Sequence, residues 1–107
     1  FDALAAKCVK AAKKRHPEVM LTLLLPYHPY DRPTPTPPGF DSTFYPPGME
    51  TVPKRAAIIQ ANRYMVEHSD YLIAYVWHLV SNARDLLEYA RKLEKREQIK
   101  ITLFDKL

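Results

Sequence analysis

Three short runs of apolar residues, at 20–25, 71–77 and 99–104, constrain the fold of this chain most strongly. Turn-forming residues bound the runs, and polar residues do not alternate within the first two. Runs of this kind are typical of strands buried on both faces, as in parallel sheets covered by helices. Helical patterns separate the runs, and strands joined through helices form right-handed crossovers. The sequence therefore predicts an α/β domain with a parallel sheet and helices on both faces.

Each helical pattern has a start signal and an apolar face. The first helix starts at Asp2, a natural N-cap, and ends before Pro17; the second starts at Pro53; and Ser81 and Asn82 cap the third. Spacing of three and four residues predicts the inner faces. They are Leu4, Cys8, Ala11 and Ala12 in the first helix, Ile58, Ile59, Met65 and Val66 in the second, and Leu86, Leu87, Ala90 and Leu93 in the third.

Length and charge narrow the class of protein. A chain of 107 residues holds one small domain, so we expect a single domain over 1–107. The net charge of +4 is modest. Basic residues crowd the first helix but are interleaved with acidic ones in the last helix, which favours solvated helix faces over a nucleic-acid groove. One cysteine, Cys8, excludes an internal disulfide, and its place on the apolar face predicts a buried, unreactive thiol. The chain is expected to be cytoplasmic, with no membrane partner.

The segment 26–53 is unusually long for a connection within a compact domain. It holds nine of the ten prolines and both glycines, Gly39 and Gly48. It also carries five aromatic residues, which are Tyr27, Tyr30, Phe40, Phe44 and Tyr45. That much aromatic surface is unlike a solvated linker, so we expect a lid or loop packed on the domain near Asn62, with a disordered linker as the alternative.

Two places in the sequence could bind a ligand. Asn62, followed by Arg63, lies on the inner stripe of the second helix, where an apolar residue would be expected. The turn after the second strand contains His78, Ser81 and Asn82, and the free N–H groups of the following helix favour an anion there. Arg55 or Arg63 could approach this anion from the second helix. A buried amide at Asn62 and a simple helix cap at the turn are the alternatives.

The sequence lacks the motifs of the common catalytic and metal sites. The four histidines have no paired helical spacing and the single cysteine forms no CxxC motif, so no metal site is predicted. No P-loop, GxGxxG or GxSxG motif occurs, and no catalytic residue or cofactor is predicted.

Three stretches carry a resemblance to a known family. FYPP at 44–47, VPKRA at 52–56 and NRYMVEHSDYLIAY at 62–75 resemble the SLOG superfamily, and in particular its YpsA-like bacterial branch of uncharacterised function. The similarity extends over essentially the whole chain. More distantly, the chain is similar to the Rossmann-like domain of the DNA-processing protein DprA and to the LOG-type phosphoribohydrolases.

The resemblance implies a Rossmann-like three-layer α/β/α fold that lacks its N-terminal strand or strands. It implies a nucleotide or nucleotide-derived ligand at the C-terminal ends of the strands, in a sensor or accessory role. It also makes Asp2 a pocket residue. With those selected above, the predicted ligand-binding residues are Asp2, Tyr27, Arg55, Asn62, Arg63, His78, Ser81 and Asn82.

The chain also departs from the family pattern. Many relatives have two glycines where this chain has Ser81 and Asn82, so anion binding at the helix terminus is expected in place of tight dinucleotide binding. The glycine-rich LOG hydrolase signature is absent. Two alternatives stay open, a DprA-like protein that binds single-stranded DNA through its basic first helix and a nucleotide N-glycosidic hydrolase that uses Asp2. Assembly into a homo-oligomer also stays open.

Overall fold

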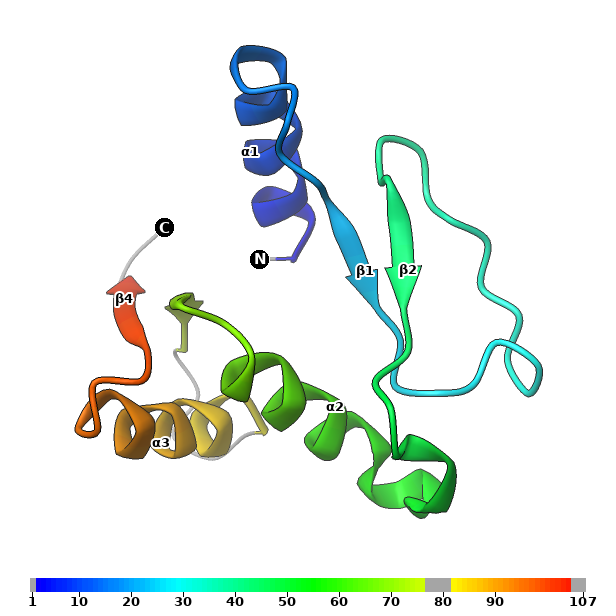
Figure 1. The fold of residues 1–107 in the computed structure, drawn as a ribbon, viewed down its shortest axis with the longest axis vertical. Helices are drawn as coiled ribbons and strands as arrows, with labels where there is room; N and C mark the ends of the chain where they lie inside the picture. The colour runs from blue at the N-terminus through cyan, green and yellow to red at the C-terminus, as the bar shows by residue number, and fades with distance from the viewer. Residues whose placement is uncertain (1, 77–81, 105–107) are drawn as a thin grey trace. The chain divides into compact units, whose positions relative to one another are not determined.

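The computed structural model describes residues 2–76 and 82–104, with the backbone alone for Asp2. The chain divides into two compact units, Phe1–Glu50 and Thr51–Leu107, and each is described by itself. Both are mixtures of helices and parallel strands, as Figure 1 shows. None of the helices in the described ranges combines the length and the apolar composition that a membrane crossing requires.

The first unit consists of one helix and one pair of strands. α1 (Asp2–Arg15) ends two residues before Pro17, as predicted. β1 (Thr22–Leu24) pairs in parallel with β2 (Ser42–Phe44), with Thr22 opposite Ser42 and Leu24 opposite Phe44. β2 lies inside the proline-rich segment and was not expected, because three residues without an apolar pattern give no strand signal. A 3-10 turn, η1 (Met49–Thr51), follows β2.

The second unit contains a complete crossover. After a 3-10 turn, η2 (Lys54–Ala56), the order is α2 (Ala57–Glu67), β3 (Tyr71–Tyr75), α3 (Asn82–Glu94) and β4 (Lys100–Phe104). β3 pairs in parallel with β4, with Tyr71 opposite Lys100. The predicted alternation of helices and strands is confirmed here, with boundaries shifted by a few residues.

The strands form two separate parallel pairs, β1 with β2 and β3 with β4. The parallel orientation agrees with the sequence prediction. That the three apolar runs share one sheet stays a prediction, because β1 belongs to the first unit and β3 and β4 to the second. β1 takes its partner from the proline-rich segment, where Leu25 N–H also donates to the Phe44 carbonyl at 2.8 Å and extends the pairing.

A small core holds the second unit together. Val66 of α2, Ala90 of α3 and Ile99 before β4 are almost fully buried, with exposed fractions of 1%, 0% and 6%. Five half-buried residues pack on them, which are Leu72, Leu86, Tyr89, Leu93 and Ile101. Because Leu72 and Ile101 are opposite each other in the sheet, one face of β3 and β4 packs against α3. Leu87 is also buried, so the predicted inner face of the third helix is confirmed.

The predicted inner face of the first helix was wrong, and that of the second is confirmed only at the buried Val66 and the half-buried Met65. In α2, Ile58 and Ile59 are 46% and 40% exposed, and the buried residues are Ala57, Ala61 and Val66. Alanines at a spacing of four allow close helix packing, but hydropathy alone favours the larger isoleucines. In α1, Cys8 is exposed and so cannot be the buried thiol that was predicted. The half-buried residues of α1 are Ala5, Ala6, Val9, Lys10 and Lys13.

The aromatic residues of the segment 26–53 differ in their surroundings. The His28 and Tyr45 rings meet edge to face at 5.2 Å, and burial raises the pKa of the Tyr45 hydroxyl. The Arg32 guanidinium lies 4.3 Å from the centre of the Tyr27 ring, whereas Tyr30 is 88% exposed. Asn62 belongs to the other unit, so packing of the segment near Asn62 stays a prediction.

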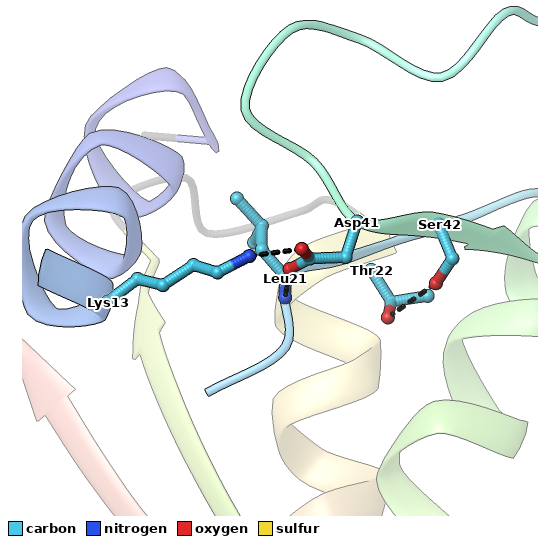
Figure 2. A network of polar contacts seen from close by, with 5 residues as sticks. All are labelled: Lys13, Leu21, Thr22, Asp41 and Ser42. Atoms are coloured by element: carbon cyan, nitrogen blue, oxygen red, sulfur yellow. Dashed lines mark hydrogen bonds and ion pairs between the residues drawn. The ribbon is translucent and has the colours of Figure 1, made fainter. Parts of the chain in front are cut away.

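Asp41 connects the three elements of the first unit (Figure 2). Its carboxylate forms an ion pair with Lys13 of α1 and accepts the Leu21 N–H at 2.7 Å. The Asp41 N–H donates in turn to the Leu21 carbonyl at 2.8 Å. The hydrogen bond from the Leu21 backbone and the one from Lys13 hold the pKa of the Asp41 carboxyl below its ordinary value.

We predict that Asp41→Asn lowers the melting temperature by a few degrees at about pH 7. The pKa of Asp41 is lower in the folded protein than in the unfolded chain. The stabilisation by the Asp41 carboxylate is therefore complete at pH values above the ordinary pKa of a carboxyl group, and it is lost as pH falls through the pKa of the folded protein. The difference between variant and wild type should therefore shrink below about pH 4. Asp31→Asn, which removes an exposed carboxylate of the same unit, is the control. A difference that stays constant with pH would contradict this role.

We predict that Val66→Ala destabilises the second unit by about 2 kcal/mol, because two buried methyl groups are lost and a cavity remains. Ile58→Ala on the same helix is the matched control, since its side chain is 46% exposed, and it should cost less than about 1 kcal/mol. Denaturant unfolding measures both values. Equal losses for the two variants would show that Val66 is not part of the core.

Candidate functional site

A small pocket in the second unit is lined by residues of α2 and α3. Ile59, Asn62 and Arg63 come from α2, and Asn82, Asp85 and Leu86 come from α3. Its volume is about 80 Å³, which is well below the 300–1,000 Å³ typical of pockets that enclose a whole organic ligand. The pocket can therefore take one chemical group of a ligand.

Helical spacing explains why these six residues meet. Residues three and four apart lie on the same helix face, so Ile59 is beside Asn62 and Arg63, and Asn82 is beside Asp85 and Leu86. α2 packs against α3, and the two faces meet at the pocket. Because α3 follows β3 in a crossover, its first turn lies at the end of the sheet where the strands terminate. This is the end at which open parallel sheets bind their ligands.

The pocket brings hydrogen-bond donors together with one carboxylate. The Arg63 guanidinium lies 5.0 Å from the centre of the Tyr89 ring, a cation–π contact that orients it from the neighbouring helix. Asn62 is half-buried, and Asn82 is exposed at the first position of α3. The first N–H groups of a helix have no partner within it and carry a partial positive charge. Asp85 supplies the only acidic side chain of the lining.

Arg84 of α3 is close to this pocket in sequence but is not part of its lining. Arg84 forms an ion pair with Glu88 one turn further along, at 3.5 Å between Nε and Oε1. Arg63 is therefore the cation of the lining. The arrangement can hold an anionic group between Arg63 and Asn82, and the Asp85 carboxylate can accept hydrogen bonds from hydroxyl or amino groups.

The structure brings together three of the residues that the sequence selected, Asn62, Arg63 and Asn82. Arg55 is exposed in η2 and does not line the pocket, and Tyr27 belongs to the first unit. His78, Ser81 and the Asp2 side chain lie outside the described residues. Their part in binding stays a prediction.

Sequence reasoning missed Asp85, together with Ile59 and Leu86. Asp85 comes three residues after Asn82, so the helical spacing that selected the helix start also places Asp85 on the same face. An acidic residue in a first helical turn is common, because it interacts favourably with the helix dipole. The spacing of Asp85 from Asn82 therefore did not by itself indicate a ligand-binding residue.

A shallow hollow lies at the opposite end of the β3–β4 sheet, where the strands begin. Its lining is rich in carboxylates and comprises Asp70, Tyr71, Glu94, Glu97, Gln98, Ile99 and Lys100. Glu94 has a structural partner, because its carboxylate accepts the Ile101 N–H at 3.3 Å. Within residues 2–76 and 82–104, no group of three metal-ligating side chains is placed to hold an ion.

Two lysines of the basic first helix have partners within their own unit. The Lys10 ammonium lies 5.4 Å from the centre of the Phe40 ring, and Lys13 pairs with Asp41. These contacts direct both side chains toward the segment before β2. The ion pair offsets the charge of Lys13, so α1 offers one cation fewer to a nucleic-acid backbone, and the basic first helix was the main support for the DNA-binding alternative.

No protein-family model matches the chain, and no curated protein or solved structure matches it. The case for the pocket therefore depends on the contacts and charges of the second unit itself.

Proposed function

We propose that the protein binds a nucleotide or nucleotide-derived ligand, with an anionic group of the ligand in the pocket between α2 and α3. The observation that carries this proposal is the meeting of Asn62, Arg63 and Asn82 in one pocket beside the first turn of α3. In this reading the protein is a sensor or accessory module, with no reaction assigned to it.

Electrostatics supports an anion at this place. A helix N-terminus attracts phosphate through its free N–H groups and its dipole, and an arginine can donate two parallel hydrogen bonds to a phosphate. The contact with Tyr89 restricts the Arg63 side chain before the ligand arrives, which lowers the entropy cost of binding.

Asp85 supports a nucleotide over a free inorganic anion. Its carboxylate repels a phosphate placed next to it, so the anion should lie on the side of Arg63 and Asn82. A carboxylate can accept hydrogen bonds from ribose hydroxyl groups, as an acidic residue at another position does in dinucleotide-binding folds. A ligand that joins a phosphate to a hydroxyl-bearing sugar therefore fits both charges of the pocket.

The proposal extends to family and location. It assigns the chain to the SLOG superfamily that residues 44–75 resemble, with the Rossmann-like fold of that family. It also places the protein in the cytoplasm, where a single exposed cysteine such as Cys8 stays reduced.

Calorimetric titration with nucleoside monophosphates tests the proposal. Asn82→Asp adds a negative charge beside the anion, and Arg63→Gln removes the positive one. Each should weaken binding by about tenfold or more, since hydrogen bonds to charged groups contribute about 1.5–3 kcal/mol. The melting temperature should hardly change for Asn82→Asp, because an acidic residue is favourable in a first helical turn.

Arg91→Gln is the matched control, because Arg91 is an exposed arginine in the last turn of α3. It should leave the affinity unchanged, and inorganic phosphate should bind the wild-type protein more weakly than the nucleotide does. If Asn82→Asp and Arg63→Gln bind as tightly as wild type, the first turn of α3 is a helix start only and the proposal fails. Absence of binding to any nucleoside monophosphate would also overturn it.

A further inference from the structure

Residues 32–38, with the sequence RPTPTPP, are restricted by covalent geometry to one backbone conformation. The pyrrolidine ring fixes φ near −65° at Pro33, Pro35, Pro37 and Pro38. A residue that precedes proline is driven toward extended values of ψ, and this applies to Arg32, Thr34, Thr36 and Pro37. Every residue from 33 to 37 is thus a proline or precedes one. The local geometry favours a left-handed polyproline II helix over this tract.

The structure leaves this tract accessible. Residues 33–37 are neither helix nor strand, and the chain runs there as an open trace between β1 and β2 (Figure 1). Residues 32–36 are all exposed. In the part of the chain that the structure describes, the backbone of residues 33–36 forms no hydrogen bond. Their carbonyl groups can therefore accept hydrogen bonds from another molecule.

Both ends of the tract are anchored within the first unit. Before it, the N–H groups of Asp31 and Arg32 donate to the His28 carbonyl at 3.0 and 2.9 Å. After it, the Phe40 N–H donates to the Pro37 carbonyl at 3.1 Å, closing a turn.

Gly39 fixes the second anchor. Its φ of +84° is a conformation that favours glycine, and a Cβ at this position would come within 2.6 Å of the Lys10 Cε atom. Since both ends are held, less conformational entropy is lost when the tract is bound.

A polyproline II helix has three residues per turn, so every third residue of the tract lies on the same ridge. Arg32, Pro35 and Pro38 are three residues apart, so a polyproline II helix places them along the same ridge. The pattern is an arginine followed by two prolines at this spacing, with Thr34 and Thr36 off the ridge. The Arg32 guanidinium lies 4.3 Å from the centre of the Tyr27 ring, and an exposed cation–π contact of this kind is weak enough to be exchanged for a carboxylate of a partner.

We propose that residues 32–38 are a docking site for a partner protein that recognises polyproline II helices. The partner would present a groove lined by aromatic side chains for Pro35 and Pro38, aromatic N–H or O–H donors for the exposed carbonyls, and a carboxylate for Arg32. A single cation in the tract is too little for a nucleic acid, which favours a protein partner. The inference rests on the first unit alone and is independent of the pocket between α2 and α3.

The test uses the whole protein and, as probe, an isolated SH3 domain that prefers peptides of the form Arg-x-x-Pro-x-x-Pro. Calorimetric titration should show saturable one-to-one binding. The double substitution of Pro35→Ala with Pro38→Ala, and the single substitution Arg32→Ala, should each weaken it at least about tenfold. Thr36→Ala is the matched control, since Thr36 is off the ridge, and it should bind like wild type. Unchanged melting temperatures show that the variants are folded.

Two results would overturn the proposal. If a synthetic peptide of residues 32–38 binds the SH3 domain but the folded protein does not, the tract is covered in the protein. If the protein binds but the double proline variant binds equally well, the contact lies elsewhere.

Discussion

The second unit depends on the packing of α2, α3 and β4 around Val66, Ala90 and Ile99. This packing determines where the polar side chains of the pocket lie. These three side chains are almost fully buried, and they come from α2, from α3 and from the residue directly before β4. Because they fix the two helices against each other, the polar residues on the adjoining helix faces also meet. The pocket is thus a consequence of the core, and a change that loosens the core should also displace Arg63 from Tyr89. In the first unit Asp41 has the equivalent role, with polar bonds in place of apolar packing.

The two units present opposite kinds of surface to a partner. The second has a small pocket with one arginine, one aspartate and two amides, which suits a compact ligand with an anionic group and hydroxyl groups. The first has an exposed, stiff and nearly uncharged tract, which suits a protein groove.

The sequence predicted the kinds of elements well and their faces less well. Helices before 17, after 53 and after 81 and the parallel strands at 71–77 and 99–104 depend on local patterns, and local patterns are strong for long elements. β2 was missed because its pairing with β1 is a contact between residues 20 apart, which no local pattern contains. The faces of α1 and α2 were assigned by hydropathy, but Lys13 is held by an ion pair and Ala61 by close packing. Asn62 could be selected because it stands where an apolar residue was expected, and Asn82 because it begins the helix after a strand, whereas Asp85 looked like an ordinary residue of a first helical turn.

The most direct test of the central claim is NMR spectroscopy of the protein during titration with a nucleoside monophosphate, with the side-chain amide signals of Asn62 and Asn82 assigned. We predict that the largest chemical-shift changes occur at these two amides, at the Arg63 guanidinium and at the backbone N–H groups of residues 82–85, because these donors surround the pocket. Changes confined to the opposite end of the sheet, around Asp70 and Lys100, or no changes at saturating nucleotide, would contradict the account.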